Sequence, residues 1–153
     1  MCAGREKPPL LLTASGGALG HDRRIANTEV PMPILASCHC GGTVIELPEP
    51  PTQATQCTCT YCTKTGGLWS YYAPEAPRLL KAEHLACYAP NTYNEHYFCA
   101  RCGITTHGVS PAWELGGEGI PETKKFAVNA RLLDDYALFT ALEIERIDGR
   151  TLW

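Results

Sequence analysis

The chain has 153 residues, and none of its apolar runs approaches the roughly 18 residues that a membrane-spanning helix needs. It also has no excess of basic side chains, because 13 Lys and Arg residues stand against 16 Asp and Glu residues, for a formal charge of -3. A domain that binds nucleic acid usually carries a basic stripe with interleaved aromatic residues. We therefore expect neither a membrane nor a nucleic acid among the partners.

Two kinds of catalytic motif are missing as well. There is no phosphate-binding glycine loop, since the run GGEG at 116–119 lacks the Lys-Ser or Lys-Thr that completes such a loop. There is no G-x-S-x-G motif of the kind that carries a serine nucleophile. Hydrophobic residues make up 44% of the chain, which is enough for a core, while 14 Gly and 12 Pro residues favour turns over long helices.

Nine cysteines are what the sequence has in excess. Disulfide frameworks are typical of short secreted chains with an even number of cysteines. Here the number is odd, and no pattern of a secretory signal is visible. We therefore expect a cytoplasmic protein whose clustered cysteines bind metal, with disulfides as the minor alternative.

Seven of these cysteines form three clusters. They are Cys38 and Cys40 in C-x-C-G, Cys57, Cys59 and Cys62 in C-x-C-x2-C, and Cys99 and Cys102 in C-x2-C-G. Each pair is followed directly by a glycine, Gly41 or Gly103, which supplies the positive φ of a sharp turn. Such turns bring sulfurs to the separation of about 3.8 Å that tetrahedral zinc requires. The two pairs therefore predict one closed zinc site with four ligands, and the alternative is four buried, reduced thiols.

The middle cluster predicts a second zinc site of a different kind. Cys57, Cys59 and Cys62 do not share a helix face, but they fit the end of a strand followed by a turn. Three ligands with no fourth nearby are typical of a catalytic zinc, which keeps one position open. Cys87 is left open, since it either completes this site or is a small buried side chain in a strand. We expect two zinc ions per chain.

The chain divides into two parts that differ in their hydrophobic patterning. Residues 1–33 show no sustained hydrophobic period, and we expect a disordered or wrongly assigned extension, with Met32 as an alternative start. Residues 34–153 are the predicted zinc-binding domain. Their strand-like segments lie at 43–47, 68–72, 85–88, 92–98, 104–109, 125–132 and 142–147. Because only 133–141 is compatible with a short helix, the predicted fold is mainly β, with at most one or two helical turns.

Taken together, the motifs C-x-C-G, C-x-C-x2-C and F-C-x2-C-G resemble those of the glutathione-dependent formaldehyde-activating (GFA) enzyme family, which shares its domain with centromere protein V. The resemblance covers residues 34–153, including the closing segments VNARL at 128–132 and IDGR at 147–150. It implies a small, mainly β, Mss4-like fold with two zinc sites. By motif position, the structural ligands are Cys38, Cys40, Cys99 and Cys102, and the catalytic ligands are Cys57, Cys59 and Cys62.

The resemblance also implies a reaction. Glutathione, or a similar thiol, and a small aldehyde such as formaldehyde would combine to S-(hydroxymethyl)glutathione, as in a carbon–sulfur lyase. Relatives often carry an Arg or Gln after the third catalytic cysteine, where this chain reads TKTGG at 63–67, so a changed substrate is one alternative. Another is a non-catalytic, zinc-stabilised module that carries glutathione or binds another protein.

Two further hypotheses concern residues that follow the third cysteine. Lys64 and the backbone N–H groups of Gly66 and Gly67 would meet a glutathione carboxylate, unless Lys64 is a solvated charge and the glycines form a plain turn. Trp69, Tyr71 and Tyr72 on the next strand are candidates to line a pocket beside the open zinc. Alternation places Trp69 and Tyr71 on one face and Tyr72 on the other, so we expect at least one face to pack in the core.

Overall fold

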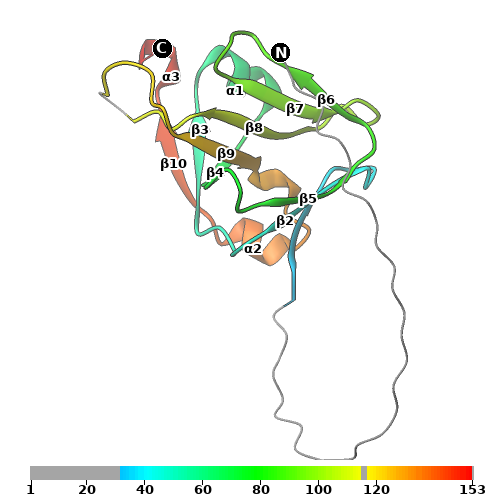
Figure 1. The fold of residues 1–153 in the computed structure, drawn as a ribbon. Coiled ribbons are helices and arrows are strands. Elements are labelled where there is room, and N and C mark those ends of the chain that lie inside the picture. The colour runs from blue at the N-terminus through cyan, green and yellow to red at the C-terminus, as the bar shows by residue number, and fades with distance from the viewer. Residues whose placement is uncertain (1–31, 115–116, 153) are drawn as a thin grey trace, which may run out of the picture. The chain divides into compact units, whose positions relative to one another are not determined.

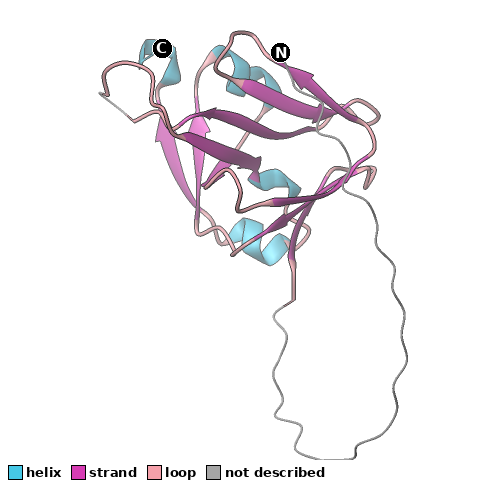
Figure 2. Cartoon of the chain, in the orientation of Figure 1, coloured by secondary structure: helices cyan, strands magenta, loops and turns pink. Residues whose placement is uncertain are grey.

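The computed structural model describes residues 32–114 and 117–152, in which short strands are joined by turns and a few short helices (Figures 1 and 2). The prediction of a disordered extension at 1–33 falls almost wholly outside these residues. The strands are β1 (Ile34–Ser37), β2 (Thr43–Leu47), β3 (Gln53–Cys57), β4 (Trp69–Tyr72), β5 (Arg78–Ala82), β6 (Leu85–Tyr88), β7 (Glu95–Cys99), β8 (Thr105–Pro111), β9 (Lys124–Asn129) and β10 (Glu143–Ile147). The helices are α1 (Thr60–Thr65), the 3-10 turn η1 (Ala130–Leu132), α2 (Tyr136–Thr140) and α3 (Gly149–Leu152).

The described strands form two sheets. The smaller has the order β1-β2-β5, and the larger has the order β10-β3-β4-β9-β8-β7-β6. Within the larger sheet β10 runs parallel to β3, with Arg146 opposite Gln56 and Ile147 opposite Cys57. This pairing places a late segment of the chain beside the first cysteine of the middle cluster.

The prediction of a mainly β fold is confirmed. Sequence patterns miss the four-residue β1 and also β5, which is exposed along its whole length. Of β3, whose burial does not alternate, only the end at Cys57 was expected. The strand predicted at 125–132 ends at Asn129, because its side-chain Oδ1 accepts the Arg131 N–H at 3.3 Å and caps η1. The helix expected within 133–141 is α2, and α1 and α3 are additional helices of one turn or slightly more.

One cluster of buried apolar side chains contains residues from both sheets. Its members are Ala36, Ile45, Leu47, Ala54, Leu68, Val128, Ala130, Leu132, Leu133 and Leu142. Because β1, β2, β3 and β9 all contribute, the two sheets share this core. No helix within the described ranges is both long enough and apolar enough to cross a membrane.

A buried asparagine at the end of β9 fixes the turn between α1 and β4. The Asn129 Oδ1 accepts the Leu68 N–H at 3.3 Å, and the Asn129 Nδ2 donates to the Thr105 carbonyl at 2.9 Å. The Ala130 N–H donates to the Leu68 carbonyl at 2.7 Å. The VNARL segment thus holds the backbone that leads from the middle cysteine cluster into β4.

Candidate metal centres

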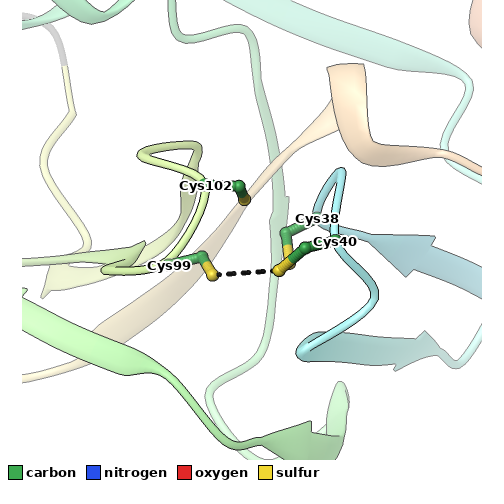
Figure 3. Close-up of side chains that lie close together, drawn as sticks. All are labelled: Cys38, Cys40, Cys99 and Cys102. Carbon is green, nitrogen blue, oxygen red and sulfur yellow. Dashed lines mark hydrogen bonds between the residues drawn. The ribbon is translucent and has the colours of Figure 1, made fainter.

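Four cysteines from two distant parts of the chain meet in the first centre. Cys38 and Cys40 follow β1, while Cys99 ends β7 and Cys102 lies in the turn after it, and all four Sγ atoms lie within 4.8 Å of one another. The Cys40 Sγ is 3.6 Å from the Cys38 Sγ and 3.5 Å from the Cys99 Sγ (Figure 3). Tetrahedral zinc with bonds near 2.3 Å needs sulfur separations of about 3.8 Å, so this group can hold a metal ion.

The two cysteine pairs sit on turns of the same design. Gly41 and Gly103 have φ values of +70° and +75°, in the left-handed region that favours glycine. The Gly41 N–H donates to the Cys38 carbonyl, and the Gly103 N–H donates to the Cys99 carbonyl, each at 2.8 Å. The glycines that the sequence singled out therefore make the sharp bends that bring each pair of sulfurs together.

The pKa values of two neighbouring thiols in the first centre are shifted in opposite directions. Burial raises the pKa of the Cys38 thiol, but hydrogen bonds from the Thr43 N–H and from neighbouring thiols outweigh it and lower the pKa to about 6. For Cys40 the Gly42 N–H lowers the pKa, but burial and the neighbouring thiols outweigh it and raise the pKa to about 11. A bound cation would lower the pKa of both thiols, because it stabilises the thiolate forms.

The second centre lies where β3 ends and α1 begins. Cys57 is the last residue of β3, Cys59 is the N-cap of α1 and Cys62 lies in its first turn, with all three Sγ atoms within 4.8 Å. The turn predicted after the strand is therefore a short helix. Within residues 32–114 and 117–152 no further Cys, His, Asp or Glu joins this group, and Cys87 on β6 belongs to neither group.

Backbone and side-chain N–H groups point at the sulfurs of the second centre. The Cys59 N–H donates to the Cys57 Sγ at 3.4 Å, and the Cys62 N–H donates to the Cys59 Sγ at 3.5 Å. The indole Nε1–H of Trp69 donates to the Cys62 Sγ at 3.2 Å. Donors of this kind favour the thiolate forms that a metal ion requires.

Burial is the largest single influence on the pKa of each thiol in this group. It raises the pKa of the Cys62 thiol to about 12, although the Trp69 N–H acts in the opposite direction. It also raises the pKa of Cys57. Burial acts the same way on Cys59, but the Cys62 N–H and the neighbouring thiols together leave the pKa of Cys59 below its usual value. Three thiolates in this position need a compensating cation, and soft sulfur ligands suit a metal such as zinc.

The segment after β10 covers the second centre. Gly149, the first residue of α3, lies so close that a Cβ there would collide with the Cys57 Sγ and would come within 3.0 Å of the Cys59 Cβ. The Thr58 hydroxyl donates to the Asp148 carboxylate at 3.0 Å. This segment therefore packs directly against the loop that carries the first two cysteines.

A cavity of about 410 Å³ opens beside the three cysteines. It is lined by Gln56, Cys57, Thr58, Cys62, Thr63, Gly66, Gly67, Arg131 and Arg146. Since two of the three candidate ligands line it, a molecule in this cavity can reach the metal site. The first centre does not contribute to the lining.

Two arginines that sequence reasoning missed line this cavity. The Arg131 Nε–H donates to the Gly66 carbonyl at 2.8 Å, and Arg146 lies on β10 opposite Gln56. In the part of the chain that the structure describes, the one ion pair joins Arg78 to Glu46, so neither cavity arginine is neutralised by a carboxylate. Arg131 falls within the VNARL segment, the only sequence signal that pointed toward it.

The substrate contacts predicted for the TKTGG segment stay predictions, and the structure places its three candidate residues differently relative to the cavity. Lys64 is exposed in the last turn of α1 and does not line the cavity. Gly66 is the left-handed C-cap of α1, and its N–H donates to the Cys62 carbonyl at 2.9 Å, so this donor already has an acceptor within the helix. Gly67 lines the cavity, and its contact with substrate stays a prediction.

A second cavity of about 400 Å³ lies along β4. Its lining includes Trp69, Tyr71 and Tyr72 together with the loop at 49–52. Trp69 is only 5% exposed, and Tyr72 packs against the core cluster, whereas Tyr71 is 43% exposed. Trp69 thus contacts a sulfur of the second centre and also forms part of this separate cavity wall.

A comparison with solved structures finds a similar protein. It is a protein of Rhodobacter sphaeroides, determined by crystallography as a structural genomics target, with a TM-score of 0.57 and 26% sequence identity. The match covers 74% of this chain and 99% of that one. No family model matches the chain, and no curated protein does. The description of the similar structure states no activity, so the comparison supports the fold and leaves the function to the site.

Proposed function

We propose that the protein is a zinc-dependent enzyme of the carbon–sulfur lyase type, which joins an anionic thiol such as glutathione to a small aldehyde such as formaldehyde. The observation that carries the proposal is the cavity in which two candidate ligands, Cys57 and Cys62, face the same space as Arg131 and Arg146. A group of three sulfurs beside two unpaired cations suits a ligand that carries both a thiol and a carboxylate.

The two metal centres have different roles in this proposal. The four-cysteine group would hold a structural zinc, because all four coordination positions are filled by the chain. The three-cysteine group would hold the catalytic zinc, which when bound supplies an open position where a thiol is held as the thiolate. The residues of the chain then bind and orient the rest of the substrate.

The arginines would select and position the thiol. A guanidinium forms paired hydrogen bonds to a carboxylate, and Arg131 is already fixed at its Nε by the Gly66 carbonyl, which leaves its terminal N–H groups for a ligand. Arg146 projects from β10, the strand beside Cys57. Two cations that line one cavity would hold a carboxylate while the thiol reaches the cysteines.

The reaction itself needs no redox partner. The substrate sulfur forms a bond to the aldehyde carbon, the carbonyl electron pair moves to oxygen, and the oxygen takes up a proton. The thiol supplies one proton and the product hydroxyl gains one, so the sum is an addition. The chain contributes orientation, because a thiol and an aldehyde held together react as one molecule.

The test is the rate of exchange between free glutathione and its formaldehyde adduct at equilibrium, measured by NMR with substoichiometric protein. The wild type should accelerate exchange above the spontaneous rate, and Cys59→Ser should not. Arg146→Gln should weaken glutathione binding, whereas Lys64→Gln, which removes the same charge outside the cavity, should not. Binding without faster exchange would refute the lyase and favour the carrier alternative.

A further inference from the structure

Trp69 makes a contact with the second centre that neither zinc chemistry nor the lyase proposal assigns. Its indole Nε1–H donates to the Cys62 Sγ at 3.2 Å, and the residue is only 5% exposed. A buried indole N–H normally requires a hydrogen-bond acceptor. Here the acceptor is a sulfur of the candidate metal site, so the position of the indole and that of the sulfur are tied together.

The indole is held in place by the surrounding backbone. A Cβ at Gly67 would lie 2.5 Å from the Trp69 Cζ2 and 2.7 Å from the Cε2, so the ring packs on a backbone that only glycine leaves clear. Trp69 also pairs across the sheet with Thr55 and with Asn129. The side chain of Asn129 in turn holds the Leu68 N–H, which fixes the residue before the tryptophan.

This contact differs from the other hydrogen bonds to the same group. The sulfurs of Cys57 and Cys59 receive backbone N–H donors, which no side-chain substitution removes. The Cys62 sulfur receives a side-chain donor, and it lines the cavity proposed for substrate. One of the two sulfur-bearing residues that line the cavity therefore receives its donor from a side chain and not from the backbone.

We propose that Trp69 is a positioning residue of the three-cysteine metal site, which orients the Cys62 sulfur and reduces the negative charge that it presents to the metal. An N–H donor to a ligating sulfur withdraws electron density from it and restricts its rotation. Removing an outer partner of a metal ligand typically weakens metal affinity by 10- to 100-fold. The inference rests on metal binding by this group and is independent of whether the lyase reaction takes place.

The test is titration of the metal-free protein with Co²⁺ alone, followed by the sulfur-to-cobalt charge-transfer absorption. Trp69→Phe keeps an aromatic ring and removes the N–H. We expect it to bind the first cobalt like the wild type and the second at least about tenfold more weakly. The band of the second cobalt should also move to longer wavelength, because sulfur electrons without the N–H donor lie higher in energy.

Trp113→Phe is the matched control, because Trp113 is 37% exposed and its hydrogen bond to the Lys125 Nζ uses the backbone carbonyl, which phenylalanine keeps. If the Phe variant at position 69 fails to fold, benzothienylalanine at that position replaces the N–H by sulfur and keeps the ring shape. Either replacement with the affinity and band of the wild type would overturn the inference.

Two outcomes separate this inference from the proposed function. If the wild type binds only one cobalt, the second metal site fails, and the inference and the lyase proposal fall together. If two cobalt ions bind and only the substitution at Trp69 disturbs the second, the inference stands even when glutathione exchange is not accelerated.

Discussion

Replacing Cys102 with serine should unfold the domain, whereas the same replacement at Cys59 should leave it folded. Each variant replaces one sulfur by one oxygen, but the two cysteine groups join residues at very different separations in the sequence. The first centre joins Cys40 to Cys99, which are 59 positions apart in the chain. The second lies within residues 57–62, which β3 and α1 already hold.

The expected loss of stability depends on the length of the loop that each metal-bound group closes. Cross-linking across about 60 residues removes unfolded-state entropy equivalent to roughly 4 kcal/mol at 25 °C, and across about six residues roughly 2 kcal/mol. A structural zinc adds on the order of 10–16 kcal/mol of apparent binding free energy. That is comparable with the entire net stability of a domain, about 5–15 kcal/mol, so loss of the first centre should abolish the folded state.

The assay is urea unfolding of zinc-loaded protein followed by circular dichroism, with the wild type and both variants at equal zinc. Cys102→Ser should lack a cooperative transition, and Cys59→Ser should keep one at a moderately lower midpoint. Equal collapse of the two variants would show that both centres are structural. A wild-type midpoint for Cys102→Ser would refute the assignment of the first centre.

Three further outcomes are expected. Purified wild type should hold two metal ions per chain by elemental analysis, and Gly149→Ala, whose new Cβ collides with the Cys57 sulfur, should hold close to one; equal counts would contradict this packing. Burial lowers the pKa of His107 from 6.5 to about 4, so its neutral form stabilises the fold above pH 6.5 and that stability, about 3 kcal/mol, is lost as the pH falls toward 4. His107→Phe should flatten this part of the pH profile of the urea midpoint, and an unchanged slope would refute the argument. Asn129→Ala should cost about 2–4 kcal/mol of unfolding free energy, because it leaves two buried groups and one partly buried N–H without their hydrogen-bond partner. The exposed Asn91→Ala should cost less than about 1 kcal/mol, and similar urea midpoints for the two variants would be inconsistent with this reasoning.

The metal ligands were the most predictable part of the site, because their information is local. Spacing and the glycines Gly41 and Gly103 specify the turns, and each turn forms from a few consecutive residues. Helix α1 was not predictable, since it has six residues, no buried side chain and a cysteine as its N-cap. The strand β5 gives no alternating pattern because it is exposed throughout.

The cavity arginines were unpredictable for a different reason. Arg146 meets Gln56 only through the parallel pairing of β10 with β3, and such pairing between distant segments leaves no local pattern in the sequence. The sequence instead pointed to Lys64, the nearest cation to the cysteines along the chain, and it lies outside the cavity. Proximity in sequence therefore identified cysteine groups that can hold a metal ion, whereas the cations that line the cavity come from distant segments.

The cover that Gly149 provides for the second centre has a consequence for biosynthesis. The chain emerges from the ribosome N-terminus first, so all four cysteines of the first centre are available once residue 102 is out. The cover of the second centre, in contrast, comes from residues made more than 80 positions after Cys62. Because Cys57, Cys59 and Cys62 emerge before Cys102, a nascent chain would present both sets of cysteines well before Gly149 encloses the second centre.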